Sequence, residues 1–399
     1  MKQKWNNENW LVSHFNYKDE VRSQFEIPPK VEIHDATLRD GEQTSGVVLT
    51  PEEKVEIATM LGECGIHRIE AGMPAVSKDD RIAIENIKKL NLNSKVFGFV
   101  RAKKEDIMMC HECGVDGVII EVPIGKPKLE YQFNWSVDRV IEASIDSIRQ
   151  AKSLGMYTVF FPYDTTRADE LDLEKLLDAV MQNSAPDSIG IVDTMGCSYM
   201  EATEFLVKLV KEKTKLPVEI HTHNDFGLAV ANSLKAVTLG ASVVHTCVNG
   251  MGDRTGNASL EEVVAGLTML LGVDLGIDIP KLMELSDKVQ ELTNYPVAVN
   301  KPIVGTNNFT REAGIGADTL FSHPLAMFAI NPYFLGRKPK LLLGKKSGMT
   351  SINIRLKEMN KELDEEAKAK LLADVKEMGI AKKRALTDEE FLRLVGKYE

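Results

Sequence analysis

Two histidines separated by a single residue, His221 and His223, stand in the segment HTHND at the end of a short apolar run. Alternate residues of a β-strand face the same side, so both imidazoles can approach one metal ion. With a carboxylate from another strand they would form a ligand set that suits Zn, Mn, Fe or Co and leaves positions open for substrate. The competing interpretation is that HTHND simply ends a strand and its histidines bond to loop backbone.

An arginine and a carboxylate stand side by side in a second polar segment, DATLRDGEQ, which contains Arg39 and Asp40. Beside a metal ligand, an arginine supplies a permanent cation and several donors, which suits an enolate or the oxygen of a 2-oxo acid. The alternative for Arg39 is a surface ion pair. Three more polar residues end other apolar runs, namely Glu70, Arg101 and Thr194.

A glycine-rich loop, NGMGDRTGN at 249–257, follows the last apolar run and leads into helical periodicity. Backbone N–H groups at such a position can hold anionic groups, although many glycine-rich loops are ordinary turns. The loop therefore adds a candidate anion-binding element to the polar strand ends.

Eight short runs rich in Val and Ile occupy the first two-thirds of the chain, each followed by a polar loop and a segment with helical periodicity. This repetition predicts an α/β fold, and eight units in about 230 residues favour closure into a (β/α)8 TIM barrel over an open sheet. Catalytic groups of such a barrel lie at the C-terminal ends of its strands, so the polar residues above should converge. The predicted strands are 31–37, 66–72, 95–101, 116–122, 156–164, 187–193, 217–223 and 242–250.

Three regions are expected along the chain. Residues 1–29 hold five of the 25 aromatic side chains, which predicts an N-terminal arm packed on the barrel or on a neighbouring subunit. Residues 30–285 would form the barrel. Residues 286–399 would form a linker or lid rich in Gly, Asn and Pro, followed by a small, mainly helical subdomain. The second of its two charged amphipathic helices should begin at the capping pattern Thr387–Glu390.

The composition excludes several classes of protein. The net charge is −10 and no block of lysine or arginine is present, which argues against nucleic acid as a partner. No apolar run approaches the ~20 residues that span a bilayer, so no membrane partner is expected. Five cysteines, an odd number, argue against a disulfide framework and for a cytoplasmic location. Cys110 and Cys113 form a lone CxxC that fits either a metal or redox pair or a helix end.

Several segments resemble, in order, the successive motifs of one enzyme family. They are DATLRDGEQTSGV, IEAGMPAVS, GIVDTMGCS, HTHNDFGLAVANSLKAVTLGA and VNGMGDRTGNASLEEVV. These look like motifs of the 2-isopropylmalate, homocitrate and citramalate synthases, which are related to hydroxymethylglutaryl-CoA lyase. The resemblance covers about 31–272, and LGKKSG at 343–348 extends it more faintly. It implies a metal-dependent Claisen-type condensation of an acyl-CoA with a 2-oxo acid, catalysed by a homodimer.

The same resemblance implies roles for individual residues. Arg39 would polarise the 2-oxo group. A divalent metal, which could be Mn, Zn, Mg, Co or Fe, would be held by Asp40, His221 and His223, with Asn257 near or on it. The 2-oxo acid pocket would be completed by Thr194, which would hold a carboxylate, and by Arg101 and Glu70.

The sequence departs from the family at its acid–base pair. The usual glutamate after the fifth strand is replaced by Tyr163 in FFPYDTTRAD, and the histidine of the partner subunit is replaced by Gly316 in EAGIGADT. Tyr163, Asp164 or His323 could take over as acid or base, since tyrosine and carboxylate groups serve in that way when their pKa is tuned. The loop VPIGKPKLEYQ also lacks the usual serine and histidine pattern, so the acyl donor or acceptor could be unusual.

Three alternatives stay open. The first is a metal-dependent lyase or aldolase that cleaves a related 2-hydroxy acid or acyl-CoA on the same scaffold, although the lyases' catalytic cysteine has no counterpart in NGMGDRTGN. The second is a metallohydrolase, which the position of the HxH pattern on the seventh strand disfavours. The third is a non-catalytic paralogue that binds metal without turnover.

Overall fold

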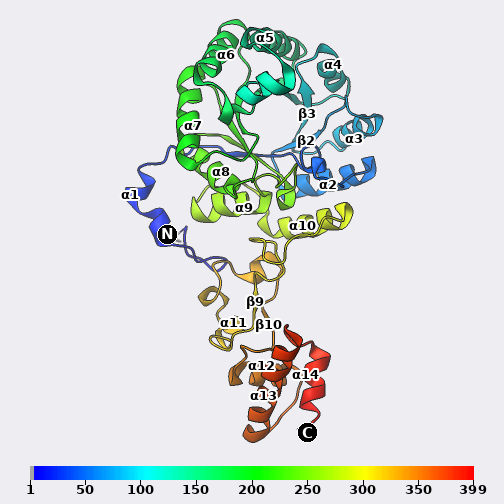
Figure 1. Cartoon of the computed structure of the whole chain (residues 1–399), viewed down its shortest axis with the longest axis vertical. Coiled ribbons are helices and arrows are strands. Elements are labelled where there is room, and N and C mark those ends of the chain that lie inside the picture. The colour runs from blue at the N-terminus through cyan, green and yellow to red at the C-terminus, as the bar shows by residue number, and fades with distance from the viewer. Residues whose placement is uncertain (1–3) are drawn as a thin grey trace. The chain divides into compact units, whose positions relative to one another are not determined.

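Eight parallel strands close into a barrel in the computed structural model, which describes residues 4–399 (Figure 1). Each strand pairs with its sequence neighbour, and β1 also pairs with β8, where His34 lies opposite His245. The predicted (β/α)8 barrel is confirmed. The strands are β1 Glu32–Asp35, β2 Arg68–Gly72, β3 Lys95–Arg101, β4 Gly117–Pro123, β5 Tyr157–Tyr163, β6 Ser188–Asp193, β7 Val218–Thr222 and β8 Val243–Thr246.

Helices ring the strands on the outside of the barrel (Figure 1). The first of the ring, α2, begins at a capping box in which Thr50 and Glu53 each bond to the other's backbone N–H, with Pro51 as its first residue. The helices of this part of the chain are α1 Asp19–Arg22, α2 Pro51–Cys64, α3 Lys78–Lys89, α4 Lys104–Glu112, α5 Val137–Ser153, α6 Glu170–Asn183, α7 Met200–Thr214, α8 Ala229–Thr238, α9 Leu260–Ala265 and α10 Ile279–Thr293.

The interior of the barrel is filled with side chains. Strands covered by helices on one face and by the barrel interior on the other must be apolar on both, which explains the unbroken Val and Ile runs. Part of the interior is an aromatic and aliphatic cluster below the C-terminal ends of the strands. Its buried members are Phe97, Phe99, Ile119, Val159, Phe161 and Val192.

Strand β8 ends four residues earlier than predicted. Asn249 and Gly250 have φ angles of 58° and 67°, which are incompatible with an extended strand and turn the chain into a short helical turn at Val248–Gly250. The glycine-rich loop therefore starts closer to the barrel than the apolar run indicates.

The chain divides into two compact units, one of residues 15–297 and one of residues 4–14 with 298–399. The boundary expected at residue 285 falls inside α10, whose buried Leu282, Leu285 and Val289 continue one apolar face. In the first unit, the Tyr17 hydroxyl donates to the Met269 carbonyl at 2.8 Å. Part of the aromatic N-terminal segment thus packs within the barrel unit.

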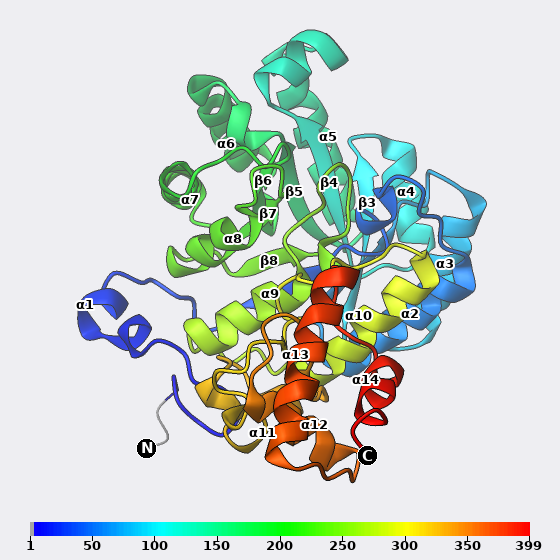
Figure 2. The same cartoon turned by 60° about the horizontal axis from the view of Figure 1, so that its bottom comes forward.

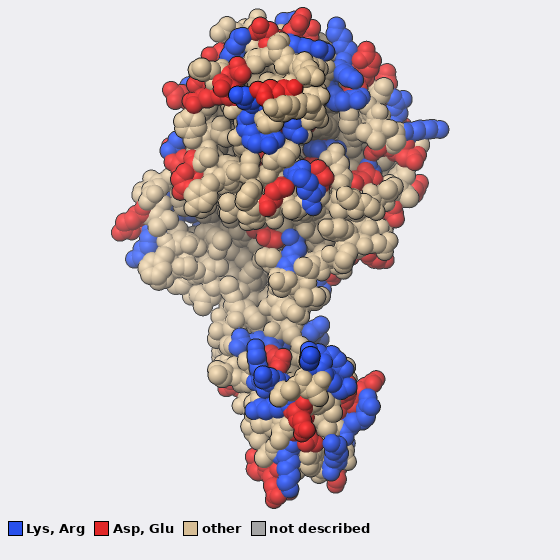
Figure 3. Space-filling model, viewed as in Figure 1, with Lys and Arg blue, Asp and Glu red and all other residues tan. Residues whose placement is uncertain are grey.

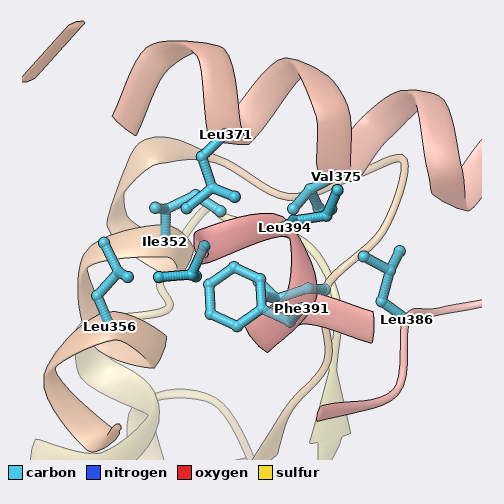
Figure 4. Packing of buried hydrophobic residues seen from close by; sticks show 9 residues of the cluster. Ile352, Leu356, Leu371, Val375, Leu386, Phe391 and Leu394 are labelled. Carbon is cyan, nitrogen blue, oxygen red and sulfur yellow. The ribbon is translucent and has the colours of Figure 1, made fainter. Parts of the chain in front are cut away.

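The second unit contains short strands and four helices. They are β9 Thr310–Arg311, β10 Lys340–Leu341, α11 Thr319–Ser322, α12 Met349–Glu358, α13 Glu365–Lys382 and α14 Asp388–Val395. Figure 2 shows α12, α13 and α14 gathered together, and Figure 4 shows the buried side chains between them, including Ile352, Leu371 and Phe391. Helix α14 begins at the predicted capping box of Thr387 and Glu390.

Within residues 4–399, no helix combines the length and apolar character that crossing a bilayer requires. On the face of the barrel turned to the viewer in Figure 3, acidic and basic side chains are interspersed rather than gathered by sign.

Candidate metal and substrate site

Three candidate metal ligands converge at the C-terminal end of the barrel. Asp40 follows β1, His221 lies in β7, and His223 follows β7 directly. Oδ2 of Asp40 lies 3.2 Å from Nε2 of His221 and 3.5 Å from Nε2 of His223, and the two Nε2 atoms are 3.3 Å apart. The closure of the barrel between β1 and β8 brings these residues together although they lie far apart in the sequence.

The candidate oxygen ligands lack hydrogen-bond donors. Among the described residues, neither carboxylate oxygen of Asp40 has a hydrogen-bond donor, and the buried Oδ1 of Asn257 has none either. Unpaired acceptors that face one another in a buried site cost free energy unless something positive lies between them. Atoms bound to one ion at about 2.1 Å lie about 3 Å apart, close to the spacings found here. The donor set therefore fits a divalent metal ion.

The site holds these residues in the charge states that bind metal. Burial alone would raise the pKa of Asp40, but the Arg39 guanidinium and the two imidazoles hold that pKa well below its ordinary value. Burial lowers the pKa of His221, and lowers the pKa of His223 to about 4. At neutral pH Asp40 is therefore an anion and both imidazoles are neutral, as coordination requires.

Arg39 is a buried cation rather than a surface ion pair. Its Nε donates to the carboxylate of Glu70, and its Nη1 lies 3.6 Å from Oδ2 of Asp40. Its Cζ lies 4.0 Å from the centre of the Phe99 ring. The Nη2 group is buried and has no partner within the part of the chain that the structure describes. It is a donor available to a substrate oxygen.

Glu70 does not line the cavity, in contrast to the expectation from the sequence. Its side chain is completely buried, with one oxygen bonded to Arg39 and the other 3.1 Å from Nε2 of His34. Both oxygens are occupied by protein groups, so no lone pair is aimed at a substrate. Glu70 orients the arginine instead.

A cavity of about 290 Å³ opens beside the three candidate ligands. Most of the residues singled out from the sequence line it. These are Arg39, Asp40, Arg101, Tyr163, Thr194, His221 and His223. Asn257 lies next to these ligands because it forms an isolated β-bridge with His223. Its Nδ2 donates a hydrogen bond to the Met251 carbonyl.

Thr194 and Arg101 reach the cavity in different ways. The Thr194 hydroxyl oxygen accepts a hydrogen bond from the Asp164 N–H at 2.9 Å, which leaves its own proton free to donate. The Arg101 guanidinium is half-exposed at the rim and donates twice to Asp106, at 2.6 and 3.0 Å. These bonds use Nε and one hydrogen of Nη2, so Nη1 can donate to a substrate while Arg101 stays paired with Asp106.

Tyr163 and Asp164 are adjacent but face different surroundings. Tyr163 lines the cavity, with Nζ of Lys128 4.9 Å from its ring centre. Asp164 has a φ of 64° and a fully buried side chain that accepts three hydrogen bonds from Arg167, the shortest at 2.7 Å. Because the turn aims this carboxylate at Arg167, the structure does not bring Asp164 to the cavity as an acid or base.

The sequence reasoning missed two residues that line the cavity. Glu121 lies in the apolar run of β4, and a single carboxylate within such a run does not by itself indicate a functional site. Arg254 belongs to the glycine-rich loop, and its guanidinium donates to Asp225 and to the Thr194 carbonyl. The position of Arg254 in that loop was the available indication, since the loop was expected to hold anionic groups.

A second buried group of potential ligands, His34, Glu219 and His245, lies in the barrel interior. The two imidazoles are stacked with ring centres 4.3 Å apart, and Nε2 of His245 is bonded to Glu219 at 2.8 Å. Glu219 also accepts from Arg68 and Ser188. Since parallel rings cannot both aim a nitrogen at one ion, we interpret this group as a hydrogen-bonded part of the core.

The CxxC pair does not form a metal centre with other groups among the described residues. Cys110 lies in α4 and Cys113 caps its C-terminal end, and both are buried. Burial raises the pKa of Cys113 to about 11, so its thiol stays protonated at neutral pH. The pair is best described as a helix end.

Comparison with family models decides the membership of the chain. The HMGL-like model matches residues 30–289, the part that carries the barrel and the converging ligands. The chain belongs to the HMGL-like family. A second model, homocitrate synthase post-HMGL domain-like, matches residues 303–383 of the C-terminal region.

Curated relatives of this HMGL-like chain are synthases. It is 37% identical over 386 residues to homocitrate synthase of Methanothermobacter thermautotrophicus, with 97% of both chains covered. It is 40% identical over 375 residues to 2-isopropylmalate synthase of Methanocaldococcus jannaschii, covering 92% of this chain and 72% of the relative. It is 40% identical over 365 residues to (R)-citramalate synthase of the same organism, covering 92% and 74%. The predicted family, and the prediction of an enzyme of its synthase group, are confirmed.

Solved structures resemble the HMGL-like barrel. HMG-CoA lyase of Bacillus subtilis matches with a TM-score of 0.63 and 18% identity, covering 70% of this chain and 98% of the lyase. The carboxyl transferase domain of Rhizobium etli pyruvate carboxylase matches with a TM-score of 0.56 and 18% identity, covering 68% and 48%. At these identities the likeness shows the fold alone.

Proposed function

We propose that the protein catalyses a metal-dependent condensation of an acyl-CoA with a 2-oxo acid to give a 2-hydroxy acid. The observation that carries this proposal is the convergence of Asp40, His221 and His223 beside Arg39 at the cavity of the barrel mouth. The names of the relatives, which are homocitrate, 2-isopropylmalate and citramalate synthases, support the synthetic direction.

The divalent ion would be held by Asp40, His221 and His223, with the unpaired Oδ1 of Asn257 as a fourth ligand. When bound there, such an ion supplies Lewis-acid polarisation and a template for the 2-oxo acid. A set of two nitrogens and two oxygens is compatible with Mn, Zn, Mg, Co and Fe. Which of these metals binds depends also on their availability in the cell.

Arg39 would stabilise the oxygen that becomes negative during the condensation. Its Nη2 is a buried donor without a protein partner, and the bond to Glu70 fixes the guanidinium before substrate arrives. A donor that is already oriented loses little free energy on reorganisation in the transition state. Arg39 is therefore the residue that we assign to the 2-oxo oxygen.

The carboxylate of the 2-oxo acid would bind on the side of Thr194. Its hydroxyl proton is free to donate, because the oxygen already accepts from the Asp164 N–H. Arg254, which bonds to the Thr194 carbonyl, and Arg101 at the rim add positive charge on the same cavity. This arrangement suits a carboxylate next to the reacting ketone.

The acyl-CoA would enter through a second cavity of about 430 Å³. It shares Arg39, Gln43 and Met73 with the first cavity, so a thioester carried in it would end at the arginine. Its other walls include the apolar side chains Val47, Val48, Leu49 and Val76, which suit the alkyl part of an acyl-CoA arm.

Proton transfer is assigned to Tyr163. The condensation needs a group that removes a proton from the acyl carbon, and the hydroxyl of Tyr163 lines the cavity at the end of β5. Asp164 is excluded from our proposal because Arg167 occupies its carboxylate. His323 lies in the second compact unit, where its Nδ1 is 3.1 Å from the Ser322 hydroxyl, and we give it no role.

Incubation with acetyl-CoA and a series of 2-oxo acids, with Mn²⁺ present, tests the proposal through release of free thiol. We expect thiol release that stops when the metal is chelated and returns when Mn²⁺ is restored. The same protein incubated with the corresponding 2-hydroxy acids tests the lyase alternative. Cleavage without condensation would reject our assignment.

We further propose that the protein acts as a homodimer in the cytoplasm. All five cysteines are free thiols, which agrees with a reducing compartment. Sedimentation equilibrium of the full chain measures the oligomeric state, and a monomer at micromolar concentration would contradict the first part of this proposal.

A further inference from the structure

Glu121 lies on β4 at the level of the cavity. It is the register partner of Arg101 on β3 and of Phe161 on β5. Two residues earlier, Ile119 belongs to the buried cluster of the barrel interior. Because alternate residues of a strand face the same side, Glu121 stands directly above that apolar cluster, and it is one of the cavity's lining residues.

The Glu121 carboxylate has no hydrogen-bond partner among residues 4–399. Arg101 directs its Nε and Nη2 groups to Asp106, and Arg39 donates through Nε to Glu70. Neither arginine donates a hydrogen bond to Glu121. The neighbouring side chain Phe161 offers no donor. Because this side chain is only partly exposed at the cavity, a ligand that fills the cavity and excludes water has to supply a donor to it.

Burial raises the pKa of Glu121 to about 7, although the positive charge of Arg39 acts to lower this pKa. The carboxylates of Asp40 and Glu70 also raise this pKa. A further negative charge placed next to Glu121 would be repelled by the carboxylate form of that residue. A hydrogen-bond donor, in contrast, would relieve the unfavourable burial.

We infer that Glu121 selects the side chain of the 2-oxo acid, and that the substrate is a short 2-oxo acid whose side chain carries a hydrogen-bond donor such as a hydroxyl or amino group. This inference rests on the proposed function and specifies its substrate class. A purely aliphatic side chain would cover the carboxyl group of Glu121 and leave it without a hydrogen-bond donor. A second carboxylate would meet like charge.

The size of the cavity limits the length of this side chain. A volume of about 290 Å³ corresponds to on the order of ten non-hydrogen atoms, at the roughly 30 Å³ that one water molecule occupies. The 2-oxo carboxylate group alone accounts for five of these atoms, and the acyl group needs space as well. The remaining room suits a side chain of two or three atoms.

Three probes of equal length test the inference, because they differ only at the terminal group. They are 4-hydroxy-2-oxobutanoate, 2-oxopentanoate and oxaloacetate, which end in a hydroxyl, a methyl and a carboxylate. For each probe, kcat/KM is measured by thiol release from acetyl-CoA, and Kd is measured by calorimetry on the Mn²⁺-loaded protein. The proteins compared are the wild type, Glu121→Leu, Glu121→Gln and the control Glu130→Gln, which changes an exposed carboxylate outside the cavity.

We expect the wild type to prefer the hydroxyl probe over the methyl probe by about 100-fold or more in kcat/KM, since a site built to bond a hydroxyl strongly rejects the analogue without it. Glu121→Leu should bring this ratio to about one or below. Glu121→Gln should keep part of the preference because its amide oxygen still accepts. Glu130→Gln should behave as the wild type.

Two results would overturn the inference. One is a wild-type preference for 2-oxopentanoate or oxaloacetate, the latter meaning that Glu121 acts as a protonated donor. The other is a hydroxyl-to-methyl ratio that Glu121→Leu leaves unchanged. If condensation occurs with all probes but the ratio does not depend on residue 121, the proposed function stands and the inference falls. If no thiol is released, the proposed function is rejected. The ratio of the Kd values for the hydroxyl and methyl probes then tests the role of Glu121. If neither probe binds, the inference about Glu121 is rejected as well.

Discussion

The Nε group of Arg39 donates a hydrogen bond to the buried carboxylate of Glu70, and this bond holds the cation beside Asp40. Glu70 is held in turn by His34 from the opening strand of the barrel. The guanidinium is therefore placed by two charged neighbours, one of which is a candidate metal ligand. The geometry leaves a single donor group, Nη2, free of protein contacts in the described chain.

Replacing Glu70 by Gln should reduce kcat by about 10- to 100-fold, the usual effect of removing a group that orients an active-site residue. The amide keeps the size of the side chain but loses the charge that fixes Arg39. KM for the 2-oxo acid should change less than kcat, because Thr194 and the metal ligands are untouched. Steady-state kinetics with parallel measurement of bound metal checks this. A loss of metal equal to the loss of activity would contradict it.

Asp40→Asn should weaken the binding of Mn²⁺ by 100-fold or more. It replaces the charged ligand between the two imidazoles by a neutral one while keeping its shape. Calorimetric titration with Mn²⁺ gives the affinity directly, without the need for activity. His111→Gln, which removes an exposed histidine of α4, is the control. Equal affinity in Asp40→Asn and the wild type would place the ion elsewhere.

Tyr163→Phe should lower kcat by about 100-fold or more while the Kd for the 2-oxo acid changes little, because only the proton-transferring hydroxyl is removed. Asp164→Asn should instead lower the melting temperature, since it leaves Arg167 without its buried partner. Single-turnover kinetics and thermal unfolding of both variants separate the two roles. The reverse pattern would move the acid–base function to Asp164.

Glu219 makes the free energy of unfolding of the barrel dependent on pH in the acidic range. Burial opposes its ionisation, but His245 and Arg68 lower its pKa from 4.5 to about 2. A lowered pKa means that this stabilisation is complete above pH 4.5 and is lost as the pH falls toward 2. Glu219→Gln should be less stable by about 3 kcal/mol at pH 7 and should show a flatter loss of stability over that acid range.

Urea unfolding at several pH values measures this dependence. Glu204→Gln is the matched control, because lysines 208 and 235 lower the pKa of Glu204 to about 2 as well, but at the solvent-exposed surface. Solvent screens such surface pairs, so the control should follow the wild-type curve. If both variants lose the same stability, the buried network has no special contribution.

The barrel and the ligand triad could be predicted from the sequence because both follow from local patterns. Runs of Val and Ile mark strands, and in this fold the ends of the strands meet at one mouth. Strand position predicts that Asp40, His221 and His223 lie at this mouth, whereas the choice of Asp40 as the carboxylate ligand came from the resemblance to the synthases. The prediction needed no knowledge of which side chain lies opposite which.

The details that the sequence did not reveal depend on partners far away in the chain. Glu70 is hydrogen-bonded to Arg39 and His34, and Arg101 is hydrogen-bonded to Asp106. The position of a residue in its strand does not specify these partners. Asp164 is diverted by a left-handed turn that places it next to Arg167. Glu121 was missed because one polar residue in an apolar run looks like an interruption of the core.

The pairing of β1 with β8 has a consequence for biosynthesis. A nascent chain that has emerged only as far as β6 carries one of the three oxygen and nitrogen ligands, Asp40, while both imidazoles are still to be made. If a metal binds these residues as proposed, its capture would coincide with the final closure of the barrel, and the ion would favour the closed barrel over any open form. Supplying Mn²⁺ during refolding would act on that final step and leave the earlier ones unaffected.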